Sequence, residues 1–363
     1  MMFYFLIPYI LILVLVIIHA NKAGVTKADT GRELPFVSVW VAARNEQDNI
    51  FACLKSLENS NYPVEKFEVL VGDDASEDNT AALVKAFIVN KPNFKLINVD
   101  RLKGKARKKA NVLAHLASHS RGELYLVCDA DVVVAKTWIN NMVASFDKET
   151  GTVSGSTAME EGTLIGKMQS MDWLFFLTVL KATADIGIPG TGVGNNMAFT
   201  KEAYWQTGGY EAIDFSITED FKLFDLIVKN GWKFKHRFDA ETLNISAPQK
   251  NFKDLLKQRK RWLTGAKEVS WLWKIFLLFF GSFYPLLLIS FFFNPQATLL
   301  VYIFKVMLQS VLLTVWRRKL FLNTKIADLI AYEFYLLIIS PAVAFYYFLP
   351  TGKSWKGRNY SLI

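Results

Sequence analysis

Apolar residues in this chain of 363 residues are concentrated toward its two ends, and this pattern constrains the fold more than any other feature. They crowd residues 2–18 and again the region from residue 275 onward, whereas residues 21–270 read as ordinary globular sequence. About 20 consecutive apolar residues are needed to cross the hydrocarbon core of a bilayer. The pattern therefore predicts a globular domain between membrane segments.

The first apolar run lacks the features of a cleaved signal peptide. No basic residue precedes it and its end makes a poor cleavage site, so we expect residues 1–20 to be an uncleaved transmembrane anchor. Lys22, Lys27 and Arg32 follow it, and the positive-inside bias then places the next domain, residues 21–270, in the cytosol. We therefore expect an integral membrane protein, located in a bacterial inner membrane or its equivalent.

Two spanning candidates follow the central domain, within residues 271–350 that we expect to form a membrane region. Residues 275–293 and 296–316 are each long and apolar enough to span, and Asn294-Pro295 between them allows only a tight turn. The basic residues 317–319 that come next favour the cytosolic side. The two segments are therefore expected to form a hairpin of spans.

The last apolar segment, residues 326–349, has two interpretations. It contains Asp328 and Glu333, it is interrupted by Pro341, and a basic tail over residues 351–363 follows it. A single span would place that tail outside the cytosol, against the preference of its charge. A re-entrant hairpin bent at Pro341 would keep the tail in the cytosol, so the number of spans in this region, two or three, stays open.

The formal net charge of +9 suggests nucleic acid as a ligand, but the positions of the charges do not favour it. Five cations lie within Lys103–Lys109, and a second cluster, Lys257–Arg261, adjoins a membrane segment. Phosphate-bearing small molecules and anionic lipid headgroups explain both clusters more simply. We therefore expect no nucleic-acid partner.

The cysteines and histidines predict neither a disulfide framework nor a metal site. Cys53 and Cys128 are too few for such a framework and stand in apolar, buried contexts. His115 and His119 are spaced as neighbours on a helix and are interpreted as helix-surface residues.

Short β-rich runs alternate with segments of helical period from residue 36 to residue 128. The predicted strands are Phe36–Ala42, Phe67–Gly72, Phe94–Val99 and Glu123–Cys128, and the predicted helices are Asn49–Asn59, Asn79–Val89 and Ala106–Ser118. This alternation with short links predicts an α/β fold with a mostly parallel, doubly wound sheet. Ligands of such sheets bind outside the carboxyl ends of the strands.

Polar and mostly acidic side chains follow all four predicted strands. The segments are Ala43-Arg44-Asn45-Glu46, Asp73 to Thr80, Lys103-Gly104-Lys105 and Asp129-Ala130-Asp131. Any one of them has a structural explanation, since Asp78, for example, can cap the next helix. Because the segments meet at one edge of the sheet, together they predict a ligand site there.

Asp129 and Asp131 stand two residues apart at a strand end, so both carboxylates can project from the same face. Two carboxylates held in this way repel each other unless a cation lies near them. A hard divalent ion, Mg2+ or Mn2+, held by one or two carboxylates and by substrate phosphates, fits the arrangement. The pair is weak evidence by itself and gains weight from its place after a strand.

Seven motifs between residues 36 and 270 occur in an order typical of one enzyme family. They are VSVWVAARNE, VLVGDDASEDNT, LKGKARKKAN, GELYLVCDAD, GNNMAFTKEAYWQTGGYE, SITEDFKL and QRKRW. With them the region resembles the family 2 glycosyltransferases, which include cellulose, chitin and hyaluronan synthases and many lipid glycosyltransferases. The resemblance implies the GT-A nucleotide-diphospho-sugar transferase fold. Trp40 and Val41 depart from the family's usual small or β-branched residues and proline, which should affect strand packing more than chemistry.

The resemblance also implies which residues bind the donor. The donor-binding set would be Ala43, Glu46, Asp73, Asp74, Lys105 and Asp129. The acids after the first two strands would bind the base and ribose, and Lys105 would meet the phosphates or the base. Asp129 would lie near the ribose and sugar, and Asp131 would be the ligand of Mg2+ or Mn2+.

Thr218-Glu219-Asp220 stands directly before a helical run, Phe221–Lys229. Acids are favourable at a helix start, so a capping role explains the motif structurally. In the family the same motif supplies the catalytic base, which corresponds to Asp220 here. Inverting glycosyl transfer needs such a carboxylate to take the proton of the acceptor hydroxyl.

The motif Gln258-Arg259-Lys260-Arg261-Trp262 comes just before the membrane region. A basic interfacial helix anchored by tryptophan would explain its composition. The resemblance implies that Gln258, Arg261 and Trp262, together with Glu219, line the acceptor site or contact the donor diphosphate. Both interpretations can hold at once.

These features predict an inverting, metal-dependent glycosyltransferase, of the hexosyl or N-acetylhexosaminyl kind, with a nucleotide-sugar donor. UDP is the commonest donor nucleotide of the family. Three or four apolar segments make a thin wall for a polymer channel, so we favour a lipid over a glycan as the membrane-associated acceptor. The alternatives are a processive polysaccharide synthase and a non-catalytic scaffold with a degenerate transferase domain. A dinucleotide-binding oxidoreductase is not favoured, because the first strand is not followed by Gly-x-Gly-x-x-Gly.

Overall fold

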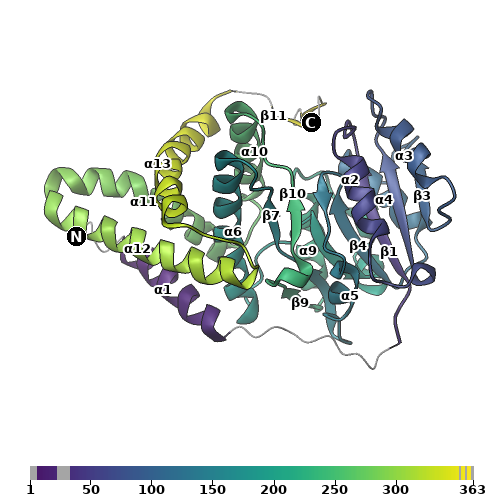
Figure 1. Cartoon of the computed structure of the whole chain (residues 1–363), viewed down its shortest axis with the longest axis horizontal. Helices are drawn as coiled ribbons and strands as arrows, with labels where there is room; N and C mark the ends of the chain where they lie inside the picture. Colours follow the sequence, from purple (N-terminus) through teal and green to yellow (C-terminus); the bar gives the residue numbers. More distant parts are fainter. Residues whose placement is uncertain (1–5, 23–32, 351–352, 356–357, 361–363) are drawn as a thin grey trace. The chain divides into compact units, whose positions relative to one another are not determined.

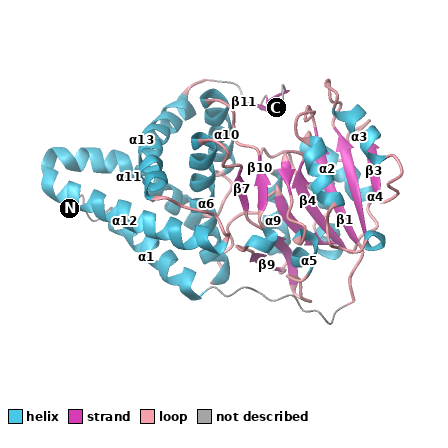
Figure 2. Cartoon of the chain, viewed as in Figure 1, coloured by secondary structure: helices cyan, strands magenta, loops and turns pink. Residues whose placement is uncertain are grey.

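The computed structural model describes residues 6–22, 33–350, 353–355 and 358–360, which form two compact units (Figure 1). Unit 1 comprises Met1–Gly24, Met159–Thr183 and Pro248–Ile363, and unit 2 comprises Val25–Ala158 and Ala184–Ala247. Figure 2 shows that the long strands belong to unit 2, whereas unit 1 is built almost entirely of helices.

Unit 2 is organised around one sheet of seven strands in the order β3-β2-β1-β4-β8-β6-β9. The strands are β1 Val37–Ala43, β2 Phe67–Asp73, β3 Phe94–Asn98, β4 Leu124–Asp129, β6 Thr150–Ser154, β8 Asn196–Thr200 and β9 Lys233–His236. Strands β3, β2, β1 and β4 are parallel, and β8 runs antiparallel to both of its neighbours. The prediction of a mostly parallel α/β sheet is confirmed.

Helices cover both faces of this sheet, because alternate side chains of its buried strands point to opposite sides. On one face Val39 and Val41 pack in a core with α2 Ile50–Glu58, α3 Thr80–Ile88 and α5 Trp138–Val143. On the other face Trp40 packs in a core with α4 Lys109–His119, α7 Lys201–Gln206, α8 Gly209–Ala212 and α9 Glu219–Lys229. This is the doubly wound arrangement.

Trp40 is fully buried, and its place shows how the sheet accepts so large a residue. Its ring stacks on Tyr125 at a centroid distance of 4.6 Å and meets Phe199 and Tyr204 edge-on. Its indole N–H donates to the Ser120 hydroxyl at 2.6 Å. The unusual residue of the first motif therefore affects packing, as expected.

Two histidines of α4 differ in their surroundings. His119 is exposed, whereas His115 is 3% exposed and its Nε2 lies 2.9 Å from the carbonyl oxygen of Arg101. The prediction of a surface position is wrong for His115, because the face of α4 that carries it packs against the sheet and the loop after β3. Cys53 and Cys128 are buried and free, as expected.

A small second sheet in the order β5-β10-β7 supports the end of β4. Its strands are β5 Val132–Val133, β10 Asn244–Ser246 and β7 Thr157–Met159. Strand β10 pairs antiparallel with β5, which places Ser246 opposite Val132. Two 3-10 turns, Val64–Lys66 and Ala240–Thr242, complete the loops around the sheets.

Among its described residues, unit 1 contains three helices that are long and apolar enough to cross a membrane. Its helices are α1 Ile7–Lys22, α6 Leu164–Asp185, α10 Phe252–Gly265, α11 Trp271–Phe293, α12 Pro295–Lys319 and α13 Ile326–Phe348. The candidate spans are α11, α12 and α13, and α1 is a shorter apolar helix. The short strands β11 Lys353–Trp355 and β12 Arg358–Tyr360 pair near the end of the chain. Residues 1–5 of the predicted anchor and residues 351–352, 356–357 and 361–363 of the predicted tail lie outside the described residues.

Helix α13 runs through Pro341 as one continuous helix, rather than as a hairpin bent there. The two acids that made this segment ambiguous both have partners. Asp328 accepts a hydrogen bond from Lys167 at 3.1 Å, and Glu333 forms an ion pair with the fully buried Lys305 at 2.8 Å. Both acids are therefore compatible with a third spanning helix.

Helix α1 packs along α12 and α11 (Figure 1). The indole N–H of Trp316 donates to the carbonyl oxygen of Val16 at 3.3 Å, and Tyr9 packs on Phe283 at a centroid distance of 4.6 Å. The first apolar run is thus a helix joined to the candidate spans, and its role as a transmembrane anchor remains a prediction.

Candidate active site

The carboxyl ends of the parallel strands meet at one edge of the large sheet. Ala43 of β1 is in register with Asp73 of β2, which is in register with Asn98 of β3, and Ala42 is in register with Asp129 of β4. The polar segments that follow the strands therefore start at the same level of the sheet.

Arg44 joins the loops that follow β1 and β2. Its side chain is buried, donates to the carbonyl oxygens of Asp74 and Ala75, and pairs with Glu77 at 2.9 Å. The backbone N–H of Asp74 donates to the Ala43 carbonyl oxygen at 2.9 Å. Ala75 has a φ of 52°, a left-handed conformation that is unusual for alanine and that turns the loop back on itself. Arg44 is a functional residue that the sequence pattern did not predict, because its burial between two strand ends appears only in the folded chain.

Two acids of the predicted donor set are held in this region by local hydrogen bonds. Asp73 accepts a bond from the Ser76 hydroxyl at 2.6 Å. Glu46 is 6% exposed, and its carboxylate accepts a bond from the Asn49 side chain at 2.9 Å. Its backbone N–H donates to the Thr80 hydroxyl at 2.8 Å. These bonds orient the two carboxylates at the carboxyl edge of the sheet.

Lys109 is the centre of a charged cluster that sequence reasoning did not find. Its ammonium lies 2.6 Å from an oxygen of Asp129 and 3.4 Å from an oxygen of Glu219, with 16% of its side chain exposed. Burial lowers the pKa of Lys109. The charges of Asp129, Glu219 and Asp220 and the hydrogen bond to Asp129 raise the pKa by more than burial lowers it, so it lies well above its ordinary value. Lys109 is therefore a fixed cation among three acids.

The start of α4 decides which lysine reaches this cluster. The sequence predicts a helix from residue 106, whereas α4 begins at Lys109, directly after Lys108 with a strained φ of 55°. Lys105 lies in the preceding loop, where its exposed ammonium pairs with Asp214 at 2.9 Å. The cation within ion-pair distance of Asp129 is therefore Lys109, and Lys105 is held at the surface.

Asp220 lies at the start of α9, where its carboxylate is anchored by two backbone N–H groups. Gly194 donates to Oδ2 at 2.9 Å, and Phe221 donates to Oδ1 at 2.9 Å. A Cβ atom built on Gly194 would lie 2.6 Å from Oδ2, so this close approach requires glycine. The expectation of an acid at the start of a helix is confirmed, and the Gly-Asn-Asn motif proves to be part of the same arrangement.

Asn195 and Asn196, the rest of that motif, make structural contacts. Asn196 is fully buried, accepts a bond from the Trp138 indole at 2.8 Å, and donates to the carbonyl oxygens of Ser156 and Thr242. Gly208 and Gly209, with φ of 78° and 61°, form a turn against the ring of Tyr204. These residues shape the scaffold rather than the site.

Asp131 lies between β4 and β5, beside the end of β10. Its carboxylate lies 3.4 Å from the Ser246 hydroxyl, and its carbonyl oxygen accepts a bond from the Ala247 N–H at 3.3 Å. Among the residues that the structure describes, no three acids, histidines or cysteines come together as a complete metal site. Asp131 and Asp129 offer hard carboxylate oxygens, which suits Mg2+ or Mn2+ held partly by substrate phosphates and water. The residues present therefore fit the predicted ion.

The last predicted set, Gln258, Arg261 and Trp262, lies on α10 of unit 1. Asn251 caps this helix by accepting a bond from the Asp254 N–H at 2.9 Å. The ring of Trp262 packs on Trp173 at a centroid distance of 4.7 Å, and the Arg259 guanidinium lies over it at 4.4 Å. All the other predicted site residues belong to unit 2.

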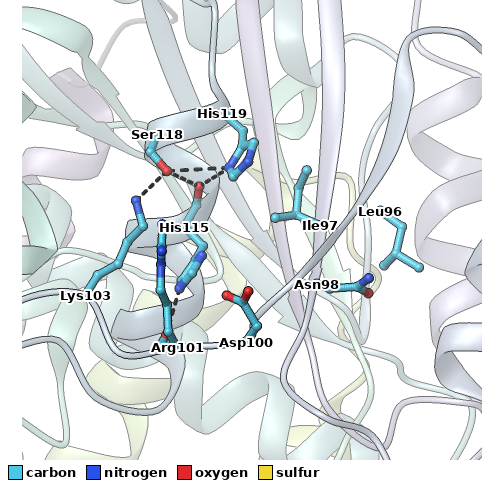
Figure 3. Close-up of a pocket in the computed structure, with 9 residues that line it drawn as sticks. All are labelled: Leu96, Ile97, Asn98, Asp100, Arg101, Lys103, His115, Ser118 and His119. Carbon is cyan, nitrogen blue, oxygen red and sulfur yellow. Dashed lines mark hydrogen bonds between the residues drawn. The ribbon is translucent and has the colours of Figure 1, made fainter.

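A pocket of 540 Å³ lies at the outer edge of the large sheet, between β3 and α4 (Figure 3). It is lined by Leu96, Ile97, Asn98, Asp100, Arg101, Lys103, His115, Ser118 and His119. Figure 3 shows Lys103 reaching the Ser118 hydroxyl, a contact of 2.6 Å. The pocket contains none of the predicted site residues.

Comparison with known proteins places the chain among glycosyltransferases. Over 247 residues it is 26% identical to "Probable glycosyltransferase YdaM" of Bacillus subtilis, which covers 66% of this chain and 57% of that protein. Over 246 residues it is 27% identical to a poly-beta-1,6-N-acetyl-D-glucosamine synthase of Staphylococcus aureus, which covers 65% of this chain and 56% of that protein. The chain thus spans little more than half the length of these curated relatives.

The structure is also similar to a solved mannosyltransferase, PcManGT of Pyrobaculum calidifontis, with a TM-score of 0.58 and 18% identity. The similarity covers 96% of this chain and 95% of the other, which shows that the two share a fold. The prediction of the GT-A fold is confirmed. The predicted enzyme class, a glycosyltransferase, is also confirmed, although the matching family carries the number 21 rather than 2. Because the family profile matches residues 4–362, the chain belongs to glycosyl transferase family 21.

Proposed function

We propose that the protein is an inverting, metal-dependent glycosyltransferase that moves a sugar from a nucleotide-sugar donor to a membrane lipid. The observation that carries the proposal is the cluster in which Lys109 contacts both Asp129 and Glu219 beside the anchored carboxylate of Asp220. It combines a fixed cation, a carboxylate of the predicted donor site and a candidate base at the carboxyl edge of one sheet.

The donor nucleoside would bind at the ends of β1 and β2. Ala43 would contact the nucleoside through its backbone. The carboxylates of Glu46, Asp73 and Asp74 can accept hydrogen bonds from a base and from ribose hydroxyls. The mannosyltransferase with the same fold was solved in complex with GDP-Man and Mn2+, which supports a nucleotide-sugar donor and a divalent ion here. We keep a UDP-sugar as the first donor to test, with Lys105 as a further donor contact.

The diphosphate would lie near Asp129 and Asp131. Asp131, with Asp129 beside it, would hold Mg2+ or Mn2+, which when bound supplies positive charge to the departing diphosphate. The Lys109 ammonium offers a second positive charge and also keeps Asp129 in place. Arg261 and Gln258 of α10 are proposed as further contacts to the diphosphate.

Asp220 is the proposed base. Inversion at the anomeric carbon requires the acceptor hydroxyl to lose its proton as it attacks from the face opposite the leaving group. The two backbone N–H groups that bind Asp220 fix the direction of its carboxylate, which is what a base needs for a well-aligned proton transfer. Glu219 and Trp262 are proposed to border the acceptor.

A membrane lipid is the proposed acceptor because the transferase unit is continuous in sequence with three candidate spans. The lysines and arginines after α1 and α12 place the sheet domain on the cytosolic side in this proposal. A processive polysaccharide synthase is the second candidate, and the relative named poly-beta-1,6-N-acetyl-D-glucosamine synthase favours it. The length of the product separates the two.

The test uses the purified full chain in lipid nanodiscs with Mn2+ or Mg2+, a panel of nucleotide sugars and a membrane-lipid extract. Mass spectrometry is expected to show one or a few sugars added to a lipid, whereas long polymer made from donor alone would favour the second candidate. Asp220→Asn is expected to keep donor binding and to lose transfer by about a hundredfold or more. Asp225→Asn, on the same helix, is the matched control and should transfer normally.

Transfer that survives in Asp220→Asn would assign the base to another residue. If no nucleotide sugar is bound or hydrolysed with metal present, the alternative of a non-catalytic scaffold would replace the enzyme.

A further inference from the structure

A group of buried and half-buried polar side chains lies among α6, α10 and α13 of unit 1. We call Asp172, Trp173, Arg259, Tyr332 and Tyr335 the polar cluster. The guanidinium of Arg259 pairs with the Asp172 carboxylate at 2.6 Å, with 12% and 18% of the two side chains exposed. The charge of Asp172 also acts on both tyrosine hydroxyls. The cluster is therefore one connected polar region inside a mostly apolar helical unit.

Several hydrogen-bonding atoms of the polar cluster have no partner of normal geometry. They are Nε1 of Trp173, Nε of Arg259 and the hydroxyls of Tyr332 and Tyr335, although the Tyr335 hydroxyl does interact with the Arg259 side chain. Within the described part of unit 1, every buried side-chain nitrogen or oxygen without a hydrogen bond belongs to this cluster. Tyr332 is only 1% exposed, so bulk water does not satisfy its hydroxyl. Buried polar groups are nearly always hydrogen-bonded, so this concentration indicates a ligand.

The chemistry of these atoms defines what the ligand must offer. The indole N–H and the guanidinium N–H can only donate, and the two phenols can donate or accept. The ligand must therefore present several acceptor oxygens, together with hydroxyls that can donate back. The charges of Arg259 and Asp172 offset each other, so the cluster has no surplus cation for a phosphate. An uncharged headgroup rich in hydroxyls meets these requirements.

Aromatic surfaces border the same atoms. Trp173 packs on Trp262 with centroids 4.7 Å apart, and Tyr332 and Tyr335 lie nearly parallel, 19° apart in plane and 6.1 Å between centroids. Trp173, Trp262 and Tyr335 are only half-buried, so parts of their rings remain open to a ligand. A pyranose has an apolar C–H face that packs on such rings and a rim of hydroxyls that bonds to donors at their edges. Rings and unpartnered donors together favour a sugar over a simple alcohol.

We propose that the polar cluster binds the sugar headgroup of a glycolipid acceptor, so that the enzyme extends a lipid that already carries a sugar. This inference rests on the proposed function and goes beyond it by naming the acceptor class. Trp173, Arg259 and Tyr332 bind the headgroup oxygens, and Trp262 provides a ring surface beside them. The lipid chains remain in the bilayer alongside α13, which is a candidate span.

Two measurements test the proposal on the full chain in nanodiscs. The first compares transfer to monoglucosyl diacylglycerol, diacylglycerol and phosphatidic acid, which present a sugar, a hydroxyl and a phosphate. The glycolipid is expected to be at least about tenfold better in kcat/KM than either of the others. The second measures binding of the same lipids by native mass spectrometry without donor, so that it does not depend on catalysis.

Conservative variants locate the site. Trp173→Phe and Tyr332→Phe keep an aromatic ring and remove one hydrogen-bonding group, and each is expected to raise the KM for glycolipid about tenfold. The KM for the nucleotide sugar should stay within twofold, which also shows that the variants are folded. Trp271→Phe and Tyr347→Phe are matched controls, because Trp271 is 67% exposed and Tyr347 lies outside the polar cluster. Both controls should behave as wild type.

The outcomes separate this inference from the proposed function. Transfer that prefers diacylglycerol or phosphatidic acid, or site variants with an unchanged KM for glycolipid, would overturn the inference and leave the function standing. If glycolipid binds and the site variants weaken that binding, but no acceptor is glycosylated, the site stands and the proposed function fails.

Discussion

Replacing Lys109 by methionine should destabilise unit 2 more than the loss of any ordinary surface lysine. The substitution keeps most of the volume of the side chain but leaves Asp129 and Glu219 together without their cation. Removing one partner of a buried ion pair costs about 3–5 kcal/mol. Because Asp129 is 35% exposed and water screens part of its charge, we expect about 2–3 kcal/mol.

The expected change in melting temperature follows from the size of the unit. Unit 2 comprises about 200 residues, for which 1 kcal/mol corresponds to a shift of about 2–4 °C. The Lys109→Met variant should therefore melt about 4–12 °C below wild type when the purified protein is heated in detergent. Added Mn2+ should recover part of the loss, because a bound cation again separates the carboxylates.

A second lysine offers a matched control. Lys229 forms an ion pair with Asp225 of the same 2.6 Å length, but its side chain is 70% exposed. Such surface pairs contribute about 0–1 kcal/mol, so Lys229→Met should shift the melting temperature by at most about 4 °C. Equal shifts for the two variants would refute the argument that burial gives the Lys109 cluster its strength.

The pH dependence of this effect has a defined sign. Burial lowers the pKa of Lys109, but the neighbouring acids raise it by a larger amount, so the pKa is higher in the folded state than in the unfolded state. Such a group contributes stability that is fully present below the unfolded-state pKa of about 10.4 and is lost as pH rises through the folded-state pKa. The difference between wild type and Lys109→Met should therefore be constant from about pH 7 to about pH 9. A difference that disappears within that range would contradict the assignment.

Three further predictions address the base, the metal and the membrane unit. Gly194→Ala places a methyl group against the Asp220 carboxylate, so in a steady-state assay kcat should fall about tenfold or more while the donor KM changes little. Gly162→Ala is the control, because open space surrounds its Cβ, and it should leave both constants unchanged. Asp131→Ala should abolish the metal dependence of donor binding in calorimetry, and an unchanged dependence would count against Asp131 as the ligand. Lys305→Met should destabilise unit 1 by about 3–5 kcal/mol, because it leaves the Glu333 carboxylate buried without its cation. The double variant Lys305→Met/Glu333→Leu should unfold at nearly the wild-type temperature. Similar losses of stability for both variants would show that the ion pair is not the cause.

Much of the fold was predictable because its signals are local. The continuous apolar, β-rich runs of β1, β2 and β4 and the helical period of α2 and α3 predicted element types and boundaries to within one or two residues. The positions of Asp129, Asp131, Glu219 and Asp220 at element ends also followed from the sequence, because the apolar run of a buried strand ends before the aspartates and acids favour the first turn of a helix.

The partners of these residues were decided only by the tertiary structure. Lys109 and Lys105 are close in a run of five cations, and nothing local distinguishes them. The late start of α4 and the strained Lys108 place Lys109 against Asp129, while Lys105 reaches only Asp214. Likewise, the contact of Gly194 with Asp220 joins residues 26 apart, which no local pattern encodes.

The same division holds for the membrane unit and its acids. Sequence by itself determined that the chain carries long apolar helices and a globular α/β domain, because hydropathy and periodicity depend on composition over short windows. It left Asp328 and Glu333 as unexplained charges in an apolar segment. Only packing showed that Lys167 and Lys305 neutralise them, and only packing brought Trp173, Arg259 and Tyr332 together from three separate helices. Pairing of buried charges and gathering of polar atoms depend on contacts between distant segments, and those contacts exist only in the folded chain.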